Sequence, residues 1–155
     1  MTSLFEAARQ CLDAADPADK VALTHRHAAA FLRGELAIPA DAPPPQPIGM
    51  PGRPPRPRLV HPRELPRRGL GSDEGRAAFL HAIAHIELNA IDLGWDAVYR
   101  FRGLPADFYR DWVQVADDEA RHFVLLRDRL RALGCDYGDF DAHNGPWEMA
   151  EKTAG

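Results

Sequence analysis

Three residues with metal-binding side chains occupy two successive stretches of helical pattern. Glu119 and His122 form a Glu-x-x-His motif, and Glu87 lies in the stretch before it. On an α-helix, residues i and i+3 lie about 60° apart, so both side chains of the motif project from one face. Carboxylate and imidazole groups are ligands that iron, manganese and zinc accept. Together with a Glu from an antiparallel neighbour, the motif supplies half the ligands of a four-helix dimetal carboxylate site.

Both stretches carry the apolar repeat of amphipathic helices. From Asp73 to Phe101 there is no proline, and apolar residues recur in alternating steps of four and three at Phe79, Ile83, Ile86, Ala90, Leu93 and Ala97. Ser72 is a candidate N-cap, and Gly103-Leu104-Pro105 stops the helix. The second helix is predicted from Pro105 to Leu133, closed by Gly134. Because few residues join the two, we expect an antiparallel hairpin.

The three candidate ligands are predicted to face the core. At 100° per residue, the residues within about 60° of Glu119 are mostly apolar: Phe108, Trp112, Val115, His122, Phe123, Leu126, Leu130 and Leu133. The same count from Glu87 gives Leu80, Ile83, Ala84, Ala90, Ile91 and Gly94. The solvated faces are expected on the opposite sides, which carry Arg110, Arg121 and Asp128 on one helix and His85, Asp92 and Asp96 on the other.

Burying two carboxylates and an imidazole costs several kcal/mol unless each finds a charged partner or a metal. We therefore expect Glu87, Glu119 and His122 to bind a metal. The alternative is a satisfied buried Glu–His pair, in which Glu87 bonds a neighbouring arginine such as Arg121 or Arg127.

The other histidines give weaker signals. His81 and His85 have the i, i+4 spacing that can chelate zinc, but His85 lies about 160° from Glu87 and is assigned to the polar face. His25 and His27 point to different sides of their helix, so both are interpreted as surface or packing residues. The two cysteines share no C-x-x-C motif, which indicates neither a zinc knuckle nor a disulfide framework.

Proline placement divides the chain into three segments. Residues 1–38 contain helical patterns at Leu4–Ala15 and Lys20–Leu36, and residues 72–155 contain the hairpin. Residues 39–71 hold eleven of the fourteen prolines and form a Pro/Arg-rich strap that cannot be helical. The six arginines of the strap could contact an acidic surface or RNA. We favour a semi-rigid connector along the protein's own acidic helices, in which the stretch from Pro43 to Pro47 contributes little packed core.

Length and composition bound the function. A chain of 155 residues with 45% hydrophobic and 27% charged residues is typical of one globular domain. No apolar run reaches the roughly 18 residues of a membrane span, and the N-terminus lacks a signal-peptide pattern, so a cytoplasmic protein is expected. The net charge of −4 gives no general drive toward nucleic acid or anionic lipid, and we expect neither as a partner.

Several motifs resemble one known family. The run from His81 to Leu93 (HAIAHIELNAIDL), the run from Phe108 to Trp112 (FYRDW) and the run from Asp118 to Phe123 (DEARHF) closely resemble a bacterial ferritin-like family of unknown function. The strap and the sequences YGDF and WEMAEK near the C-terminus continue the match over nearly the whole chain. The resemblance implies an all-α, ferritin-like fold and a carboxylate-bridged dimetal centre, with Glu87, Glu119 and His122 at the ligand positions of the first half. It implies no particular reaction.

The resemblance also implies that ligands are missing. Members of the family continue into a third and a fourth long helix with a second ligand set, whereas this sequence ends at Gly155, soon after Pro146 starts a helical pattern. We therefore expect a ferritin-like half-bundle that forms a homodimer, in which a second copy supplies the remaining ligands. The expected cofactor is iron at a two-metal site, with manganese and zinc as alternatives. The expected function is an oxidoreductase that activates O2 or peroxide for an unidentified small-molecule substrate; the alternatives are a non-enzymatic iron-binding or assembly protein and an inactive truncated fragment.

Overall fold

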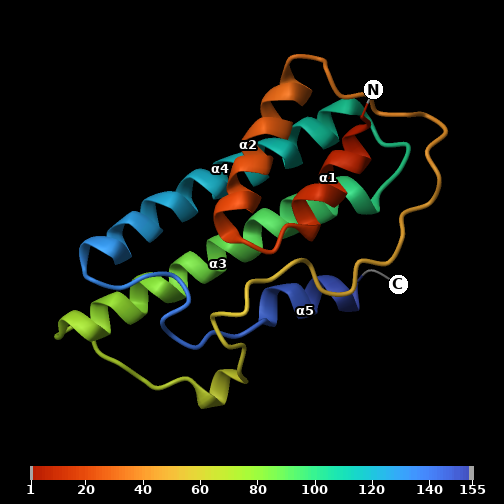
Figure 1. Cartoon of the computed structure of the whole chain (residues 1–155). Helices are drawn as coiled ribbons and strands as arrows, with labels where there is room; N and C mark the ends of the chain where they lie inside the picture. Colours follow the sequence, from red (N-terminus) through yellow and green to blue (C-terminus); the bar gives the residue numbers. More distant parts are fainter. Residues whose placement is uncertain (1, 154–155) are drawn as a thin grey trace.

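The computed structural model describes residues 2–153 and is built from helices and loops (Figure 1). Five α-helices occur in the order α1 (Leu4–Asp13), α2 (Pro17–Leu32), α3 (Asp73–Arg100), α4 (Ala106–Ala132) and α5 (Gly145–Lys152), with one 3-10 turn, η1 (Pro62–Glu64), between α2 and α3. Within the described residues there is no β-strand, only two isolated bridges. The prediction of an all-α fold is confirmed.

Helices α3 and α4 form the predicted antiparallel hairpin, and local sequence sets their ends. The Ser72 hydroxyl accepts a hydrogen bond from the Gly75 N–H at 3.0 Å, which caps the start of α3 as expected. At the far end of α4, Gly134 has φ +80°, the left-handed conformation that closes a helix. Gly94 lets the hairpin pack closely, because a Cβ there would lie 3.1 Å from that of Ala116.

Helices α1 and α2 form a second, shorter pair that covers one side of the hairpin. In Figure 1 they lie in front of it, with α1 against α3 and α2 against α4. Leu4, Ala8 and Leu12 of α1 are buried in the shared core together with Trp95 of α3. The Trp95 indole N–H donates to the Thr24 hydroxyl of α2 at 3.0 Å.

The covering by α1 and α2 overturns one prediction about α3. His85, Asp92 and Asp96, assigned above to its solvated face, are all buried. Asp92 is paired with the buried ammonium of Lys20 of α2 at 2.5 Å, and Asp96 is paired with Arg100. The reason is that segments remote in sequence lie on that face: α2 supplies Lys20 to Asp92, and the loop after α4 supplies the partners of His85, whereas the cation beside Asp96 comes from α3 itself.

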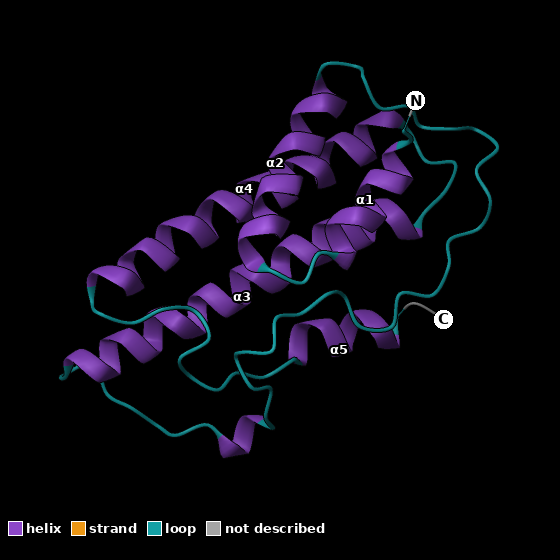
Figure 2. Cartoon of the chain, viewed as in Figure 1, coloured by secondary structure: helices purple, strands orange, loops and turns teal. Residues whose placement is uncertain are grey.

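The strap follows the surface as a long loop from the end of α2 to the start of α3, interrupted by the single turn of η1 (Figure 2). Four of its arginines pair with carboxylates of the same chain: Arg53 with Asp92, Arg56 with Asp139, Arg58 with Asp141 and Arg68 with Glu74. These pairs agree with the interpretation of the strap as a connector along the protein's own acidic groups.

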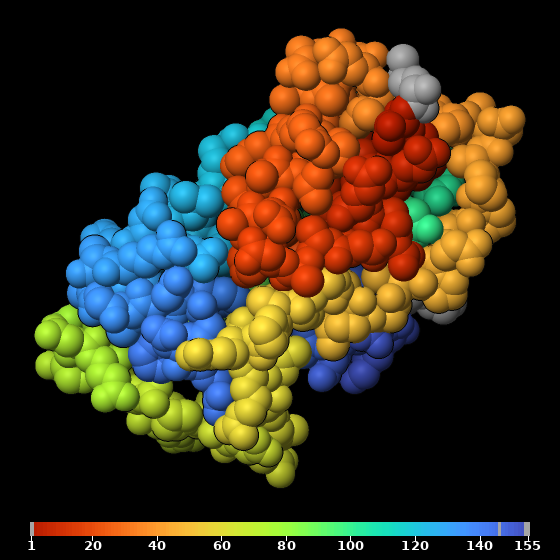
Figure 3. Space-filling view, in the orientation of Figure 1, coloured from red at the N-terminus to blue at the C-terminus, as the bar shows by residue number. Residues whose placement is uncertain are grey.

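The stretch from Pro43 to Pro47 is mostly exposed, as expected, but the part of the strap that follows it contributes to the packed structure. Pro51 and Pro57 are buried, and the Gly52 N–H donates to the Leu12 carbonyl at 2.7 Å. The space-filling view shows this segment wedged between α1 and α5 (Figure 3). Helix α5 is fixed by the buried Trp147, whose indole N–H donates to the Gly49 carbonyl at 2.5 Å. None of the described helices is long and apolar enough to cross a membrane.

Candidate metal centre

The hairpin brings Glu87, Glu119 and His122 together. Glu87 lies at the middle of α3 and Glu119 at the middle of α4, so an antiparallel pair joined by a short loop places them level. One ligand atom from each of the three residues lies within 4.8 Å of the other two. His122 Nδ1 is 3.5 Å from Glu119 Oε2 and 3.8 Å from Glu87 Oε2. The convergence predicted from the spacing is present.

Their burial differs from the prediction. The side chains of Glu87 and Glu119 are 20% and 24% exposed, and that of His122 is 55% exposed, so none of them faces the core. On α4 the buried residues centre about 70° from Glu119 in helical angle; they are Tyr109, Val113, Ala116, Ala120, Phe123 and Leu130. The physical reason is that α1 and α2 pack on that rotated side. The candidate ligands consequently lie along the rim of the opposite, uncovered side.

The arginine partners of the alternative interpretation are engaged elsewhere. Arg121 pairs with Asp117 and Asp118 of its own helix, and Arg127 pairs with Asp136. Glu119 Oε2 is buried, yet it makes no hydrogen bond to any described residue. A buried carboxylate oxygen without a donor is costly. An ion held between the two carboxylates and the imidazole would compensate it, so this donor set fits a transition metal.

An apolar face surrounds the cluster. On α3 it includes Ile83 and Ile86, and on α4 it includes Trp112 and Val115; Ile86 is 53% exposed and the other large side chains are half-buried or exposed. Next to the cluster, α3, α4 and α5 enclose a groove of about 420 Å³ lined mainly by Ala90, Leu93, Ala97, Trp112, Val115 and Met149. The cluster is therefore bordered by a surface that single soluble chains rarely leave open.

The pair His81 and His85 is held in a different arrangement. His81 Nε2 accepts the Gly138 N–H at 3.0 Å, and its ring stacks on Tyr137. His85 Nε2 lies 2.7 Å from the His143 carbonyl, which can only accept, so His85 donates there and accepts from the Tyr137 hydroxyl at 2.8 Å. Burial lowers the pKa of each imidazole to about 4. Both are neutral packing residues: both ring nitrogens of His85 and Nε2 of His81 are occupied, which corrects the surface assignment of His85.

His25 and His27 do not share a ligand, as expected from their spacing. His25 Nδ1 lies 2.5 Å from an Asp117 carboxylate oxygen of α4, and His27 Nε2 lies 2.9 Å from the Gln10 side-chain oxygen of α1. Each therefore connects α2 to a different neighbouring helix.

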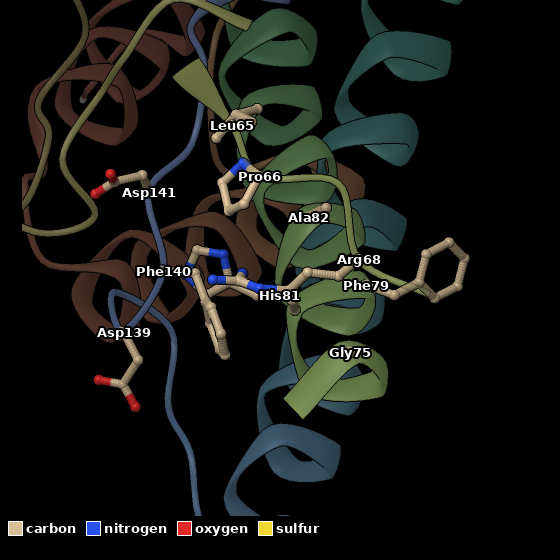
Figure 4. A pocket seen from close by; sticks show the side chains of 11 residues that line it. Leu65, Pro66, Arg68, Gly75, Phe79, His81, Ala82, Asp139, Phe140 and Asp141 are labelled. Atoms are coloured by element: carbon tan, nitrogen blue, oxygen red, sulfur yellow. The ribbon is translucent and has the colours of Figure 1, made fainter. Parts of the chain in front are cut away.

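A second pocket, of about 380 Å³, lies beside the N-terminal half of α3 (Figure 4). Its polar residues already have partners. The Arg68 guanidinium lies over the Phe140 ring, 5.2 Å from the centroid, and is 3.7 Å from a Glu74 carboxylate oxygen. Asp139 and Asp141 pair with arginines of the strap. Among the described residues, the pocket offers no convergent set of metal-binding groups comparable to the cluster on the hairpin.

The fold and the cluster define an all-helical protein with a candidate carboxylate–histidine metal centre on an antiparallel hairpin. The chain belongs to a family described as "Protein of unknown function (DUF455)", whose pattern matches residues 13–155. It is 50% identical over 108 residues to an uncharacterized protein of Haemophilus influenzae. That match covers 65% of this chain and 38% of the relative, so the chain spans well under half of the relative's length. No solved structure matches.

Proposed function

We propose that this protein binds iron, or a chemically similar divalent metal, through Glu87, Glu119 and His122 as part of a ferritin-like dimetal carboxylate centre. The observation that carries the proposal is the convergence of these three side chains, among which the buried Glu119 Oε2 accepts no hydrogen bond from a described residue. No lysine or arginine lies in the helical sector within about 60° of Glu119. A metal ion would thus supply the positive charge that the two carboxylates lack.

The proposed roles rest on analogy with dimetal carboxylate proteins. Glu87 and His122 would act as terminal ligands and Glu119 as the bridging ligand. A bound pair of iron ions supplies redox chemistry toward O2 or peroxide at coordination positions that the protein leaves open. The apolar groove beside Val115 and Leu93 would hold an apolar small-molecule substrate next to the centre and exclude bulk water from it.

Metal content of the purified chain tests the site. Elemental analysis after anaerobic loading with Fe(II) and desalting should find iron retained by the chain. Glu119→Ala should abolish retention of the metal. Asp118→Asn is the matched control, because Asp118 precedes Glu119 but bonds Arg121 and Gln114 on the surface. Wild-type stoichiometry in the Glu119 variant would place the metal elsewhere.

A second measurement separates the enzymatic proposal from its alternative. Aerobic consumption of a reductant by the iron-loaded protein, lost in Glu119→Ala, would support an O2- or peroxide-activating oxidoreductase. Tight iron binding without turnover would instead support a non-enzymatic iron-binding protein.

A further inference from the structure

The pocket beside the N-terminal half of α3 is built from three segments that are far apart in the sequence (Figure 4). They are the end of the strap, the first three turns of α3 and the loop that follows α4. Its volume of about 380 Å³ lies within the range of small-molecule sites. Much of its wall is apolar, and is formed by Leu65, Pro66, Ala78, Ala82 and Phe140.

His81, which lines this pocket, has a partner at one ring nitrogen only. The residue is 1% exposed, and Nε2 accepts the Gly138 N–H at 3.0 Å. Because Nε2 is the acceptor, the proton of the neutral ring lies on Nδ1. Nδ1 makes no hydrogen bond to a described residue, nor is it among the polar atoms that the fold seals off without a partner. Its N–H is therefore a fixed donor that a molecule in the pocket can reach.

Arg68 adds a positive charge that is only weakly neutralised. The guanidinium is held at the pocket by the Phe140 ring, which it covers. The carboxylate paired with it, that of Glu74, is 3.7 Å away, longer than a hydrogen bond, and its side chain is 72% exposed. So exposed a pair contributes little. The planar fork of the guanidinium thus keeps N–H donors in the geometry that matches a carboxylate.

The other charges around the pocket favour a ligand with a single negative charge. Asp139 pairs with Arg56 at 3.3 Å. Asp141 pairs with Arg58 at 2.7 Å. These two pairs cancel, which leaves Arg68 as the cation available to a ligand. A dianion such as phosphate would bring a second negative charge close to both aspartates, and like charges at short range repel.

We propose that this pocket binds a small organic monocarboxylate. The guanidinium of Arg68 pairs with the carboxylate, and the Nδ1–H of His81 donates to one of its oxygens. The apolar wall around Phe140 covers the organic body of the molecule. Gly75, in the first turn of α3, also lines the pocket, so the positive end of the helix dipole favours the same anion.

This site is separate from the candidate metal centre. His81 and Glu87 lie on the same helix, about 9 Å apart along its axis and about 120° apart around it. The pocket therefore lies on a different side of α3 from the cluster. Because no metal ligand takes part, metal-free protein should bind the carboxylate, and this proposal and the proposed function can fail independently.

Titration of metal-free protein with acetate, benzoate and cinnamate tests the proposal in the presence of chelator. Nitrogen–proton NMR spectra of the imidazole rings should show saturable binding that moves the His81 Nδ1–H signal downfield; His81→Gln identifies this signal by removing it. Affinity should rise from acetate to benzoate, because the larger body covers more of the apolar wall. Benzamide, which has the same ring without the charge, should bind about tenfold or more weakly than benzoate. A His81 signal that none of the three carboxylates moves would overturn the proposal.

A pair of arginine variants separates the site from general attraction of anions. Arg68→Gln should weaken benzoate binding about tenfold or more, because a charged hydrogen-bond donor is lost. Arg67→Gln is the matched control, since it removes the same charge one position away and Arg67 does not line the pocket. It should bind benzoate like the wild type. Equal weakening in the two variants would show that the arginine charge attracts benzoate without a defined site, and the proposal would fail.

Inorganic phosphate tests the choice of a monoanion. It should displace benzoate only at concentrations well above those at which benzoate binds, because of the two aspartates at the pocket. Phosphate that binds more tightly than benzoate and moves the same His81 signal would overturn the monocarboxylate and assign the pocket to a phosphate group.

Discussion

The Lys20 ammonium lies 2.5 Å from an Asp92 carboxylate oxygen, and both side chains are essentially inaccessible to solvent. The ammonium also donates to the carbonyls of Cys11 and Leu12 at 3.0 and 3.2 Å. Burial raises the pKa of Asp92, and the nearby positive charges of Lys20 and Arg53 oppose that rise. This pair connects the end of α1, helix α2 and helix α3 at one point of the core.

Breaking this pair should be costly. Lys20→Met leaves a buried carboxylate without its main partner, and we expect a loss of about 3–5 kcal/mol in the free energy of unfolding. The double variant Lys20→Met/Asp92→Asn should lose less free energy of unfolding than the two single variants lose together, because it leaves no unpaired charge in the core. Urea unfolding of the four proteins measures the coupling. Additive losses would show that the pair does not act as a unit.

Acid should destabilise the protein through His81. Its pKa is lowered by burial to about 4, below its value in the unfolded chain, so the unfolded state takes up a proton first as the pH falls. The stabilising contribution is complete above about pH 6.5 and is lost as the pH falls toward 4, by up to about 1.4 kcal/mol per pH unit. His81→Gln can still accept the Gly138 N–H without titrating. Urea midpoints between pH 7.5 and 5 should therefore depend less steeply on pH in this variant; an unchanged slope would contradict the assignment.

The strap should tolerate no side chain at Gly52. A Cβ there would lie 2.2 Å from the Asp13 carbonyl oxygen, and the neighbouring backbone cannot yield as a flexible side chain would. Gly52→Ala should therefore destabilise the protein by roughly 1–3 kcal/mol. Gly71→Ala, in the same segment but with no atom near its added methyl group, is the control and should be close to neutral. Thermal unfolding compares the two, and equal midpoints would show that the strap is not held against α1.

The packing of α3 against α4 should be sensitive to substitution of Gly94. An added Cβ there would lie 3.1 Å from the Ala116 Cβ, so a larger side chain must push α3 and α4 apart. Gly94→Val should lower the free energy of unfolding by roughly 1–3 kcal/mol and weaken metal binding, because the separation of Glu87 from Glu119 depends on the same packing. Ala97→Val, on the uncovered face of the same helix, provides the comparison. Equal effects of the two substitutions would contradict the role of Gly94.

The sequence by itself determined the helices and the convergence of the candidate ligands. Helix ends depend on local signals, and those at Ser72 and Gly134 lie where the caps and the left-handed turn occur. Glu87 lies level with Glu119 because a short connection joins the two long helices and fixes their register. The helix ends and the convergence of the candidate ligands depend only on interactions between residues that are close in sequence or lie in adjacent helices.

Only the tertiary structure decided which sides of these helices are buried. A periodic apolar pattern gives a direction, but on α3 the side that carries His85, Asp92 and Asp96 is buried as well, so the pattern alone does not say which side is covered. The lack of lysine and arginine between Arg76 and Arg100 was the one signal that α3 has no ordinary solvated face. The covering groups, Lys20 on Asp92 and Arg53 beside it, come from segments far away in the sequence. Burial of α3 on that side depends on these long-range contacts, and it leaves Glu87, Glu119 and His122 at the rim of the uncovered face.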